Sequence, residues 1–238
     1  EWGNRTGEKY YDMKGTPMIK AVLFDLDGTL VDTELLSARA WLASGERLGL
    51  DVSEELIKSF VGRTADAVTS MLIEHLGITE ATAHELFSLH RSIKEELMEN
   101  ELAAKPFAVK ALSVLKDHGF ALGLATSSYR PVAERELEPF GMQAYFDSIT
   151  CGDEIEHGKP APDIYLLAAE RLGMRPEECA VVEDSPNGVR AGAAAGMSVF
   201  LVPDTIEPTL EIRSMCVDVL GSLDELAGAI RLRNEEIA

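Results

Sequence analysis

The chain has 238 residues, enough for one large domain or two modest ones, and its 46% hydrophobic and 26% charged residues are typical of a soluble globular protein. Its 22 basic and 41 acidic residues give a formal net charge of −19, spread along the whole chain. Such a charge repels nucleic acids and anionic membranes, so we expect neither as a partner. No apolar stretch reaches the roughly 18 residues that a membrane-spanning helix needs.

The cysteines and the first residues of the chain indicate a cytoplasmic protein. Cys151, Cys179 and Cys216 form no Cys-x-x-Cys pair, which predicts buried, reduced thiols. Residues 1–17 are polar and glycine-containing, without the apolar centre of a signal peptide, so we expect a disordered leader, with Met18 as a natural start. Because no heptad pattern or long exposed apolar strand argues for assembly, we expect a monomer.

The first predicted element is a strand over residues 19–24, and two aspartates follow it directly. A continuous apolar run that ends in turn residues is typical of a fully buried parallel strand. Asp25 and Asp27, in the sequence Asp-Leu-Asp-Gly-Thr at 25–29, are two residues apart and are therefore expected to point the same way. Two adjacent carboxylates are costly without a cation. The pair predicts a metal site and a nucleophile, and Gly28 permits the tight turn that follows.

Residues 32–105 contain no segment that is typical of a buried strand, and we expect them to form a small helical bundle. Helices are predicted over residues 33–48, 53–60, 65–76 and 80–102. In the last of these, apolar residues recur at the three- and four-residue spacing of a helix face, at Leu86, Leu89, Ile93 and Leu97. An insertion of this kind, directly after the first strand of an α/β domain, is interpreted as a lid.

The rest of the chain alternates between strands and helices. Further strands are predicted over residues 120–125, 145–151, 179–182, 198–202 and 216–220. Proline opens and glycine closes three helices between them, at 106–119, 131–141 and 162–173. This alternation predicts an α/β fold, a Rossmann-like doubly wound parallel sheet with helices on both faces. The predicted units are a leader at 1–17, a catalytic core at 18–31 and 106–238, and a helical cap at 32–105.

Polar side chains follow four of the predicted strands. Because ligands of open α/β sheets bind at the carboxyl ends of the strands, we expect these loops to meet at one rim. Besides the two aspartates, the loops contribute Thr126, Ser127 and Ser128 after the second strand, Lys159 after the third, and Glu183, Asp184 and Ser185 after the fourth.

These residue types suit a phosphorylated ligand and a hard metal ion. The carboxylates of Asp25, Glu183 and Asp184 are ligands that Mg²⁺ prefers, and a backbone carbonyl near the second aspartate can join them. The Thr126 hydroxyl and the backbone N–H groups that follow it can hold phosphoryl oxygens. Lys159 adds a positive charge that allows an anionic group to approach an anionic nucleophile.

The four segments, in this order, resemble the four motifs of the haloacid dehalogenase superfamily of phosphohydrolases. The resemblance is carried by Asp-Leu-Asp-Gly-Thr at 25–29, Thr126 with its two serines, Lys-Pro-Ala-Pro-Asp at 159–163 and Glu-Asp-Ser at 183–185. The helical insertion resembles the C1-type cap of this superfamily. From about residue 19 to its end, the chain is similar to the branch that contains β-phosphoglucomutase, sugar-phosphate phosphatases and phosphoglycolate phosphatase.

The resemblance implies a role for each of these residues. Asp25 would attack phosphorus and form an aspartyl-phosphate, and Asp27 would act first as general acid and then as general base. The implied ligands of Mg²⁺ are Asp25, Asp27, Glu183 and Asp184, and the metal would offset the repulsion between nucleophile and phosphoryl group.

The remaining implied roles concern substrate binding. Thr126, Ser127 and Lys159 would position and neutralise the phosphoryl group. In the cap, Arg63 lies in a short loop that joins two predicted helices, where it could bind a second anionic group of the substrate or simply be a solvated turn residue.

Other activities of the superfamily fit these residues less well. Haloacid dehalogenases lack the second aspartate, which is present here as Asp27, and phosphonate hydrolases use a cap lysine, whereas Lys58 has no clear reason to be desolvated. β-Phosphoglucomutase carries a cap histidine where this chain has Ser37, and its cap arginine does not align cleanly with Arg63. We therefore predict a Mg²⁺-dependent phosphatase of a small phosphorylated metabolite, with a sugar phosphate first. The alternatives are a phosphosugar mutase and, from another class, a non-catalytic phosphate-binding regulatory protein.

Several nearby residues are explained by structure rather than by chemistry. Trp41 and Phe60 are expected in the core of the cap, and Asp163 and Ser185 at the starts of helices. The histidines at 75, 84, 90, 118 and 157 show no metal-ligand spacing, and surface positions account for most of them.

Overall fold

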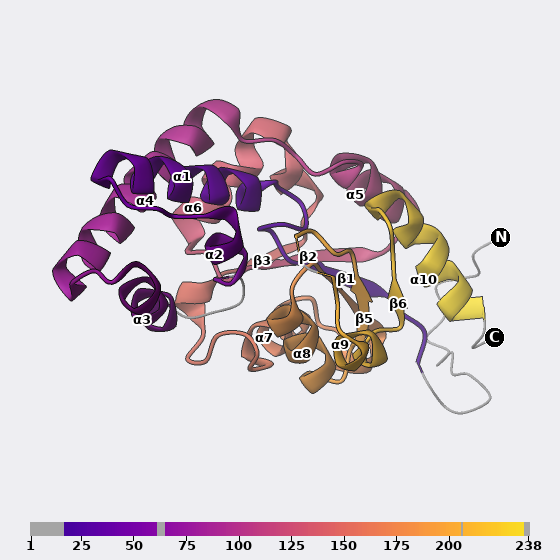
Figure 1. Cartoon of the computed structure of the whole chain (residues 1–238). Helices are drawn as coiled ribbons and strands as arrows, with labels where there is room; N and C mark the ends of the chain where they lie inside the picture. Colours follow the sequence, from indigo (N-terminus) through magenta and orange to yellow (C-terminus); the bar gives the residue numbers. More distant parts are fainter. Residues whose placement is uncertain (1–16, 61–64, 206, 236–238) are drawn as a thin grey trace.

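The structure is a computed structural model that describes residues 17–60, 65–205 and 207–235. Arg63 and almost all of the leader predicted at 1–17 lie outside these ranges. At the centre of the fold is one sheet of six parallel strands in the order β3-β2-β1-β4-β5-β6 (Figure 1). The prediction of a Rossmann-like, doubly wound parallel sheet is confirmed.

All six predicted strands are present, some with shorter bounds. They are β1 (Ala21–Phe24), β2 (Ala121–Ala125), β3 (Ser148–Thr150), β4 (Cys179–Glu183), β5 (Ser198–Leu201) and β6 (Asp218–Val219). The third is shorter than the 145–151 expected, because a 3₁₀ turn, η2 (Met142–Tyr145), occupies the start of that segment. The other 3₁₀ turns are η1 (Glu138–Phe140), η3 (Gly152–Glu154), η4 (Pro176–Glu178) and η5 (Leu223–Glu225).

Helices cover both faces of the sheet. Outside the insertion they are α5 (Ala108–Asp117), α6 (Arg130–Leu137), α7 (Asp163–Arg171), α8 (Pro186–Ala194), α9 (Leu210–Met215) and α10 (Leu226–Glu235). Alternate residues of β1 enter different cores: Val22 and Phe24 pack with residues of α5, α6 and α10, whereas Ala21 and Leu23 pack with residues of α7, α8 and α9. Because both faces are covered, the strands read as continuous apolar runs.

The segment between β1 and α5 is helical, as predicted. It consists of α1 (Thr33–Leu48), α2 (Glu54–Lys58), α3 (Ala65–Leu76) and α4 (Glu80–Glu101). The second helix is shorter than expected because Ser53 is its N-cap, with Oγ accepting a hydrogen bond from Leu56 N at 3.2 Å. Trp41 and Phe60 lie in the apolar core of these helices, as predicted.

Two chain segments connect the inserted helices with the sheet, and they are hydrogen bonded to each other. Asp32 N donates to Ala103 O at 2.9 Å, and Lys105 N donates to Leu30 O at 2.9 Å. Val31 and Ala104 form an antiparallel bridge between them. The two connecting segments therefore lie at the predicted boundary between core and cap. The division into a core at 18–31 and 106–238 and a cap at 32–105 stays a prediction.

None of the helices in the described ranges is both long and apolar enough to cross a membrane. The three cysteines are free thiols, as predicted, although only Cys151 and Cys179 are buried and Cys216 is half-buried. Burial raises the pKa of Cys151 to about 11 and that of Cys179 to about 12. These thiols are therefore protonated at neutral pH.

Candidate active site

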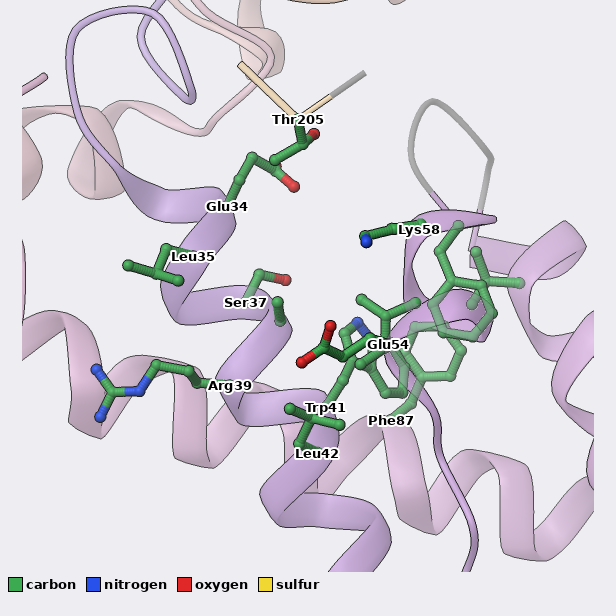
Figure 2. A pocket seen from close by; sticks show the side chains of 14 residues that line it. Glu34, Leu35, Ser37, Arg39, Trp41, Leu42, Glu54, Lys58, Phe87 and Thr205 are labelled. Carbon is green, nitrogen blue, oxygen red and sulfur yellow. The ribbon is translucent and has the colours of Figure 1, made fainter. Parts of the chain in front are cut away.

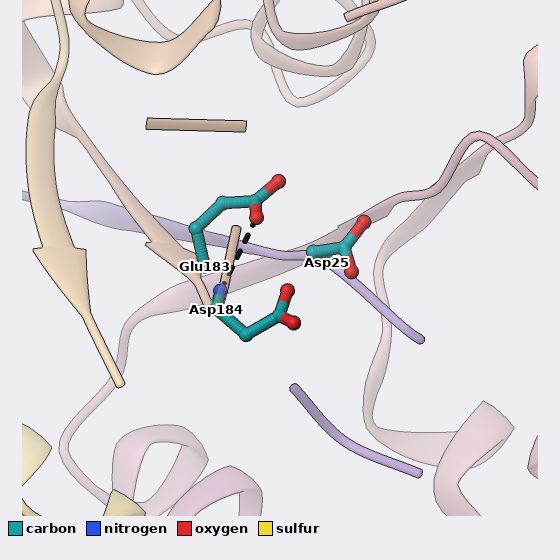
Figure 3. Close-up of side chains that lie close together, drawn as sticks. All are labelled: Asp25, Glu183 and Asp184. Atoms are coloured by element: carbon teal, nitrogen blue, oxygen red, sulfur yellow. Dashed lines mark hydrogen bonds between the residues drawn. The ribbon is translucent and has the colours of Figure 1, made fainter. Parts of the chain in front are cut away.

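The carboxyl ends of β1 and β4 bring three carboxyl groups together. Asp25 follows β1 directly, Glu183 is the last residue of β4, and Asp184 comes next. One carboxylate oxygen from each lies within 4.8 Å of the others, and Figure 3 shows the three side chains grouped at this rim. Asp25 is only 7% exposed and Glu183 is fully buried, so the group needs a compensating positive charge.

Lys159 supplies positive charge from the loop after β3. Its Nζ donates to Asp25 Oδ1 at 2.5 Å, to Glu183 Oε1 at 2.6 Å and to Ala125 O at 3.2 Å. All three donors of the ammonium are thereby used. Burial acts to lower the pKa of Lys159, but the Asp25 and Glu183 carboxylates outweigh it and hold the pKa well above its usual value. Lys159 is therefore a fixed charge that joins the ends of β1, β2 and β4.

Glu183 is saturated by protein donors. Its Oε1 accepts from Lys159 Nζ and from Tyr165 Oη at 2.6 Å each. Its Oε2 accepts from Asp184 N at 3.2 Å, Ser185 N at 3.2 Å and Ser185 Oγ at 3.0 Å. Burial alone would raise the pKa of Glu183, but the Lys159 ammonium and these hydrogen bonds lower it. A carboxylate offers about four lone-pair sites, so protein donors already engage both oxygens of Glu183 in this structure.

The Glu183 carboxylate also explains a glycine in α8. A Cβ atom at Gly188 would overlap the carboxyl group of Glu183, so no side chain fits there. The α8 N-cap, predicted at Ser185, is present: Ser185 Oγ accepts from Gly188 N at 3.1 Å. The same hydroxyl therefore caps the helix and donates to the carboxylate of Glu183.

Asp184 has the opposite character, because it is short of donors. Among the described residues, its carboxylate accepts a long hydrogen bond from Thr29 Oγ1, at 3.5 Å. Burial raises the pKa of Asp184 well above its usual value, and the Glu183 and Asp25 carboxylates raise it further. Gly28, with φ of 79°, lies so close that a Cβ atom would overlap this carboxylate. A half-buried carboxylate in need of a cation, beside Asp25, fits a hard divalent metal ion.

Asp27 lies outside the group of three carboxylates, and the expectation that it points the same way as Asp25 stays a prediction. The strand ends at Phe24, so strand alternation does not reach residue 27. Its Oδ1 accepts from Thr33 Oγ1 at 2.8 Å, and its Oδ2 accepts from Ser128 Oγ at 2.9 Å. The Asp27 carboxylate is thereby fixed between the first residue of α1 and the loop after β2.

The loop after β2 is placed as the sequence predicts. Thr126 is fully buried, its N–H donates to Thr150 O at 3.1 Å, and its Oγ1 accepts from Ser128 N at 3.0 Å. Ser127 is exposed, and its carbonyl lies so close to Gly152 that a Cβ atom there would overlap it. The Thr126 hydroxyl proton remains available to a ligand.

On the side of the inserted helices, a cavity of about 600 Å³ adjoins these residues (Figure 2). It lies between α1 and α2 and reaches Thr205 in the segment after β5. Glu34 lines it next to Thr33, the residue that donates to Asp27. Burial raises the pKa of Glu34, and the nearby carboxylates of Asp27 and Asp204 also raise it, whereas Lys94 lowers it. Glu34 is therefore the lining residue that connects the cavity with the carboxylates of Asp27 and Asp184.

Sequence reasoning missed the environment of position 37. Ser37 Oγ lies 3.2 Å from His90 Nε2. The imidazole next to position 37 therefore comes from α4, whereas α1 itself carries a serine there. His90 is half-buried and stacked on Trp41 with a centroid distance of 4.0 Å, rather than at the surface. Burial lowers the pKa of His90 to about 4. The sequence signal was the helical period of residues 80–102, which does not identify the residue of another helix that a given side chain contacts.

Two further residues of the site have no motif of their own. Tyr165 lies on α7, two residues after the predicted helix start at Asp163. It is fully buried, and its hydroxyl donates a hydrogen bond to Glu183. Glu136, on α6, is 1% exposed, and its Oε2 has no hydrogen-bond partner among the described residues. Burial raises the pKa of Glu136 to about 8. Arg63 lies outside the described residues, so its predicted role stays open.

Comparison with known proteins agrees with this geometry. The family of haloacid dehalogenase-like hydrolases matches residues 19–196. Hexitol phosphatase A of Escherichia coli is 39% identical over 183 residues, 77% of this chain and 82% of that protein. The phosphorylated carbohydrates phosphatase of Thermotoga maritima is 35% identical over 179 residues, 75% of this chain and 82% of that protein. The crystal structure of CbbY from Rhodobacter sphaeroides in complex with phosphate is 30% identical, with a TM-score of 0.70 over 90% of this chain and 100% of that chain.

Proposed function

Because this chain belongs to the haloacid dehalogenase-like hydrolases, and is a phosphoric monoester hydrolase, we propose that it is a Mg²⁺-dependent phosphatase of a small phosphorylated metabolite, with a sugar phosphate as the first candidate. The observation that carries the proposal is the Lys159 ammonium, which bonds Asp25 and Glu183 at 2.5 and 2.6 Å. The names of the two relatives, which refer to hexitols and phosphorylated carbohydrates, support the choice of substrate class.

In the proposed reaction Asp25 is the nucleophile. Lys159 occupies Asp25 Oδ1, which leaves Oδ2 to attack phosphorus. The Asp25–phosphorus bond forms while the bond from phosphorus to the leaving oxygen breaks, and Asp27 protonates that oxygen. Asp27 then takes a proton from water, which attacks phosphorus and releases inorganic phosphate and free Asp25. Thr126 and Ser127 hold the phosphoryl oxygens during both steps.

The carboxylates of Asp25 and Asp184 fit a bound Mg²⁺, with a backbone carbonyl near Asp27 as a further ligand. A metal ion there neutralises charge between the nucleophile and the phosphoryl group. Glu183, saturated by Lys159 and its neighbours, orients this set instead of contributing a free oxygen. This assigns Glu183 a positioning role, where the sequence predicts a ligand.

We also propose that the inserted helices act as a cap that closes over the site. The paired linkers at 31–32 and 103–105 are the natural hinge, and closure would exclude bulk water from the reaction. Arg63 is proposed to bind the substrate from this cap; unchanged kcat and KM in Arg63→Ala for every phosphate ester tested would contradict that. A cytoplasmic location and a monomeric state stay predictions.

A phosphosugar mutase is the second candidate, and one observation favours it. His90 brings an imidazole within 3.2 Å of Ser37, so the missing histidine at position 37 is a weaker argument against mutase chemistry than the sequence suggests. A non-catalytic phosphate-binding role is disfavoured because Asp25, Asp27 and Asp184 are all present.

Phosphate release with Mg²⁺ by the wild type and by Asp25→Asn separates these candidates. The phosphatase predicts release of inorganic phosphate that Asp25→Asn abolishes. Conversion of β-glucose 1-phosphate to the 6-phosphate without release of phosphate would establish the mutase instead. Activity that survives Asp25→Asn would contradict the assignment of the nucleophile.

A further inference from the structure

We propose that the cavity between α1 and α2 holds the leaving group of the phosphate ester, and that Ser37, held by His90, recognises a hydroxyl group of an uncharged leaving group. This inference rests on the proposed phosphatase function and deepens it, because it assigns a specificity-determining residue to this chain.

The cavity has the size and the lining of a small-molecule site. Its volume of about 600 Å³ falls in the range of ligand pockets, which are mostly apolar with a few directed polar groups. Trp41, Phe60 and Phe87 form its apolar side, in edge-to-face contacts with centroid distances of 5.3 and 5.0 Å from Trp41. Figure 2 shows the Ser37 hydroxyl and the Lys58 ammonium pointing into it from α1 and α2.

Ser37 is a polar lining residue whose side chain is held in place by a hydrogen-bond partner. Its Oγ lies 3.2 Å from His90 Nε2, and the His90 ring is fixed by stacking on Trp41 at 4.0 Å with an interplanar angle of 14°. The bond to His90 uses one of the three hydrogen-bonding positions of a hydroxyl. Ser37 therefore keeps at least one acceptor position for a ligand, whichever tautomer His90 adopts.

The neutral state of His90 decides what kind of ligand group Ser37 can bind. Burial lowers the pKa of His90 to about 4, so the imidazole carries no charge at neutral pH. Ser37 is then one end of an uncharged hydrogen-bonded pair, which suits a hydroxyl that can donate or accept. This pair contributes no positive charge that would favour an anionic group over a hydroxyl.

The charges around the cavity also disfavour a second anionic group. Two carboxylates line it, those of Glu34 and Glu54. Of the two basic residues that line it, Arg39 already pairs with Glu101, at 2.5 and 3.1 Å. Lys58 alone does not offset both carboxylates. Among the described residues, the lining therefore favours an uncharged, hydroxylated leaving group with an apolar face.

The test compares two phosphate esters whose leaving groups differ in hydroxyl groups. A hexitol phosphate presents several hydroxyls, and p-nitrophenyl phosphate presents none. In Ser37→Ala we expect kcat/KM for the hexitol phosphate to fall about fivefold to tenfold, through KM, as loss of one neutral hydrogen bond predicts. We expect kcat/KM for p-nitrophenyl phosphate to change less than about twofold.

A second variant tests the part played by His90. His90→Phe keeps a ring against Trp41 but removes the hydrogen bond, so it should lose the same selectivity, and the double variant should lose no more than either single one. Ser37→Thr, which keeps the hydroxyl, should retain selectivity. Ser44→Ala is the matched control, because Ser44 also lies on α1 but bonds Ala40 O at 2.6 Å and is fully buried.

Equal losses for both esters in Ser37→Ala, or no loss for either, would overturn the assignment of Ser37. Additive losses in the double variant would overturn the role of His90. A wild type that hydrolyses p-nitrophenyl phosphate but no hydroxylated ester would overturn the substrate class while leaving the phosphatase function intact. A wild type that releases phosphate from neither ester would contradict the proposed function itself, and with it this inference.

Discussion

At the carboxyl ends of the strands, Lys159 donates three hydrogen bonds to fixed, buried acceptors, whereas in the cavity between α1 and α2 the Lys58 ammonium extends from an exposed position. At the rim of the sheet, Lys159 pairs with Asp25 and Glu183, whereas Asp184 accepts a long hydrogen bond from Thr29. The cavity is lined by aromatic and aliphatic side chains with a few polar groups. In the proposed function, the rim would carry out the chemistry and the cavity would select the leaving group. Changes at the rim should therefore affect all substrates, and changes in the cavity only some.

The largest effect is expected from the nucleophile. Asp25→Asn keeps the size of the side chain but removes the attacking carboxylate, so phosphate release should fall on the order of 10⁴-fold or more for every ester. Steady-state kinetics with a hexitol phosphate and p-nitrophenyl phosphate measures this. A loss confined to one of the two esters would contradict the division between rim and cavity.

Removal of the buried cation should affect stability as well as activity. Lys159→Met leaves Asp25 and Glu183 buried without their partner, so the free energy of unfolding should fall by about 3–5 kcal/mol. Urea unfolding at neutral pH measures the change, and Lys58→Met, in the cavity, is the matched control with an expected change below about 0.5 kcal/mol. Similar losses in both variants would contradict the contrast between the two lysines.

Metal dependence should separate Asp184 from Glu183. Chelation of Mg²⁺ is expected to abolish phosphate release. Asp184→Asn should raise the Mg²⁺ concentration for half-maximal activity more than about 100-fold, and Glu183→Gln about 10- to 100-fold, as is usual for groups that only orient ligands. Activity titrations with Mg²⁺ give both values. A larger shift in Glu183→Gln than in Asp184→Asn would show that Glu183 is the ligand.

The smallest effect concerns the pH dependence of stability in the inserted helices. The pKa of His90 is about 4 in the folded protein and 6.5 in an exposed histidine, so between these values the unfolded state binds the proton more tightly. Stability of the wild type should therefore fall as pH decreases from about 6.5 toward 4. His90→Phe should remove part of this slope, whereas Ser37→Ala should keep it. Urea midpoints at several pH values would contradict the burial of His90 if the two variants behaved alike.

Much of the rim could be predicted from sequence because its residues follow strands. Asp25, Thr126 and Glu183 lie directly after apolar runs, and parallel strands bring their carboxyl ends to one edge whatever the rest of the chain does. Strand alternation does not extend to Asp27, which lies beyond the end of β1, and its partners Thr33 and Ser128 come from separate segments.

The cavity could not be predicted in this way. Ser37 and His90 are 53 residues apart, and their contact depends on how α1 packs against α4. Helical periodicity identifies which face of a helix is apolar, but not which residue of another helix lies opposite a given side chain. Glu136 gave no signal either, because a glutamate on a helix is ordinarily exposed. The Ser37–His90 contact and the burial of Glu136 depend on how helices pack, so they could be recognised only in the structure.

The central claim is that Asp25 carries the phosphoryl group during turnover, and the most direct test is to trap it there. Asp27→Asn slows the hydrolysis of the intermediate, and p-nitrophenyl phosphate needs little acid assistance to form it. After a rapid acid quench, peptide mass spectrometry should find one phosphoryl group on Asp25, and none in the Asp25→Asn, Asp27→Asn double variant. Phosphate release by the wild type together with a phosphoryl group on a different residue would contradict the account.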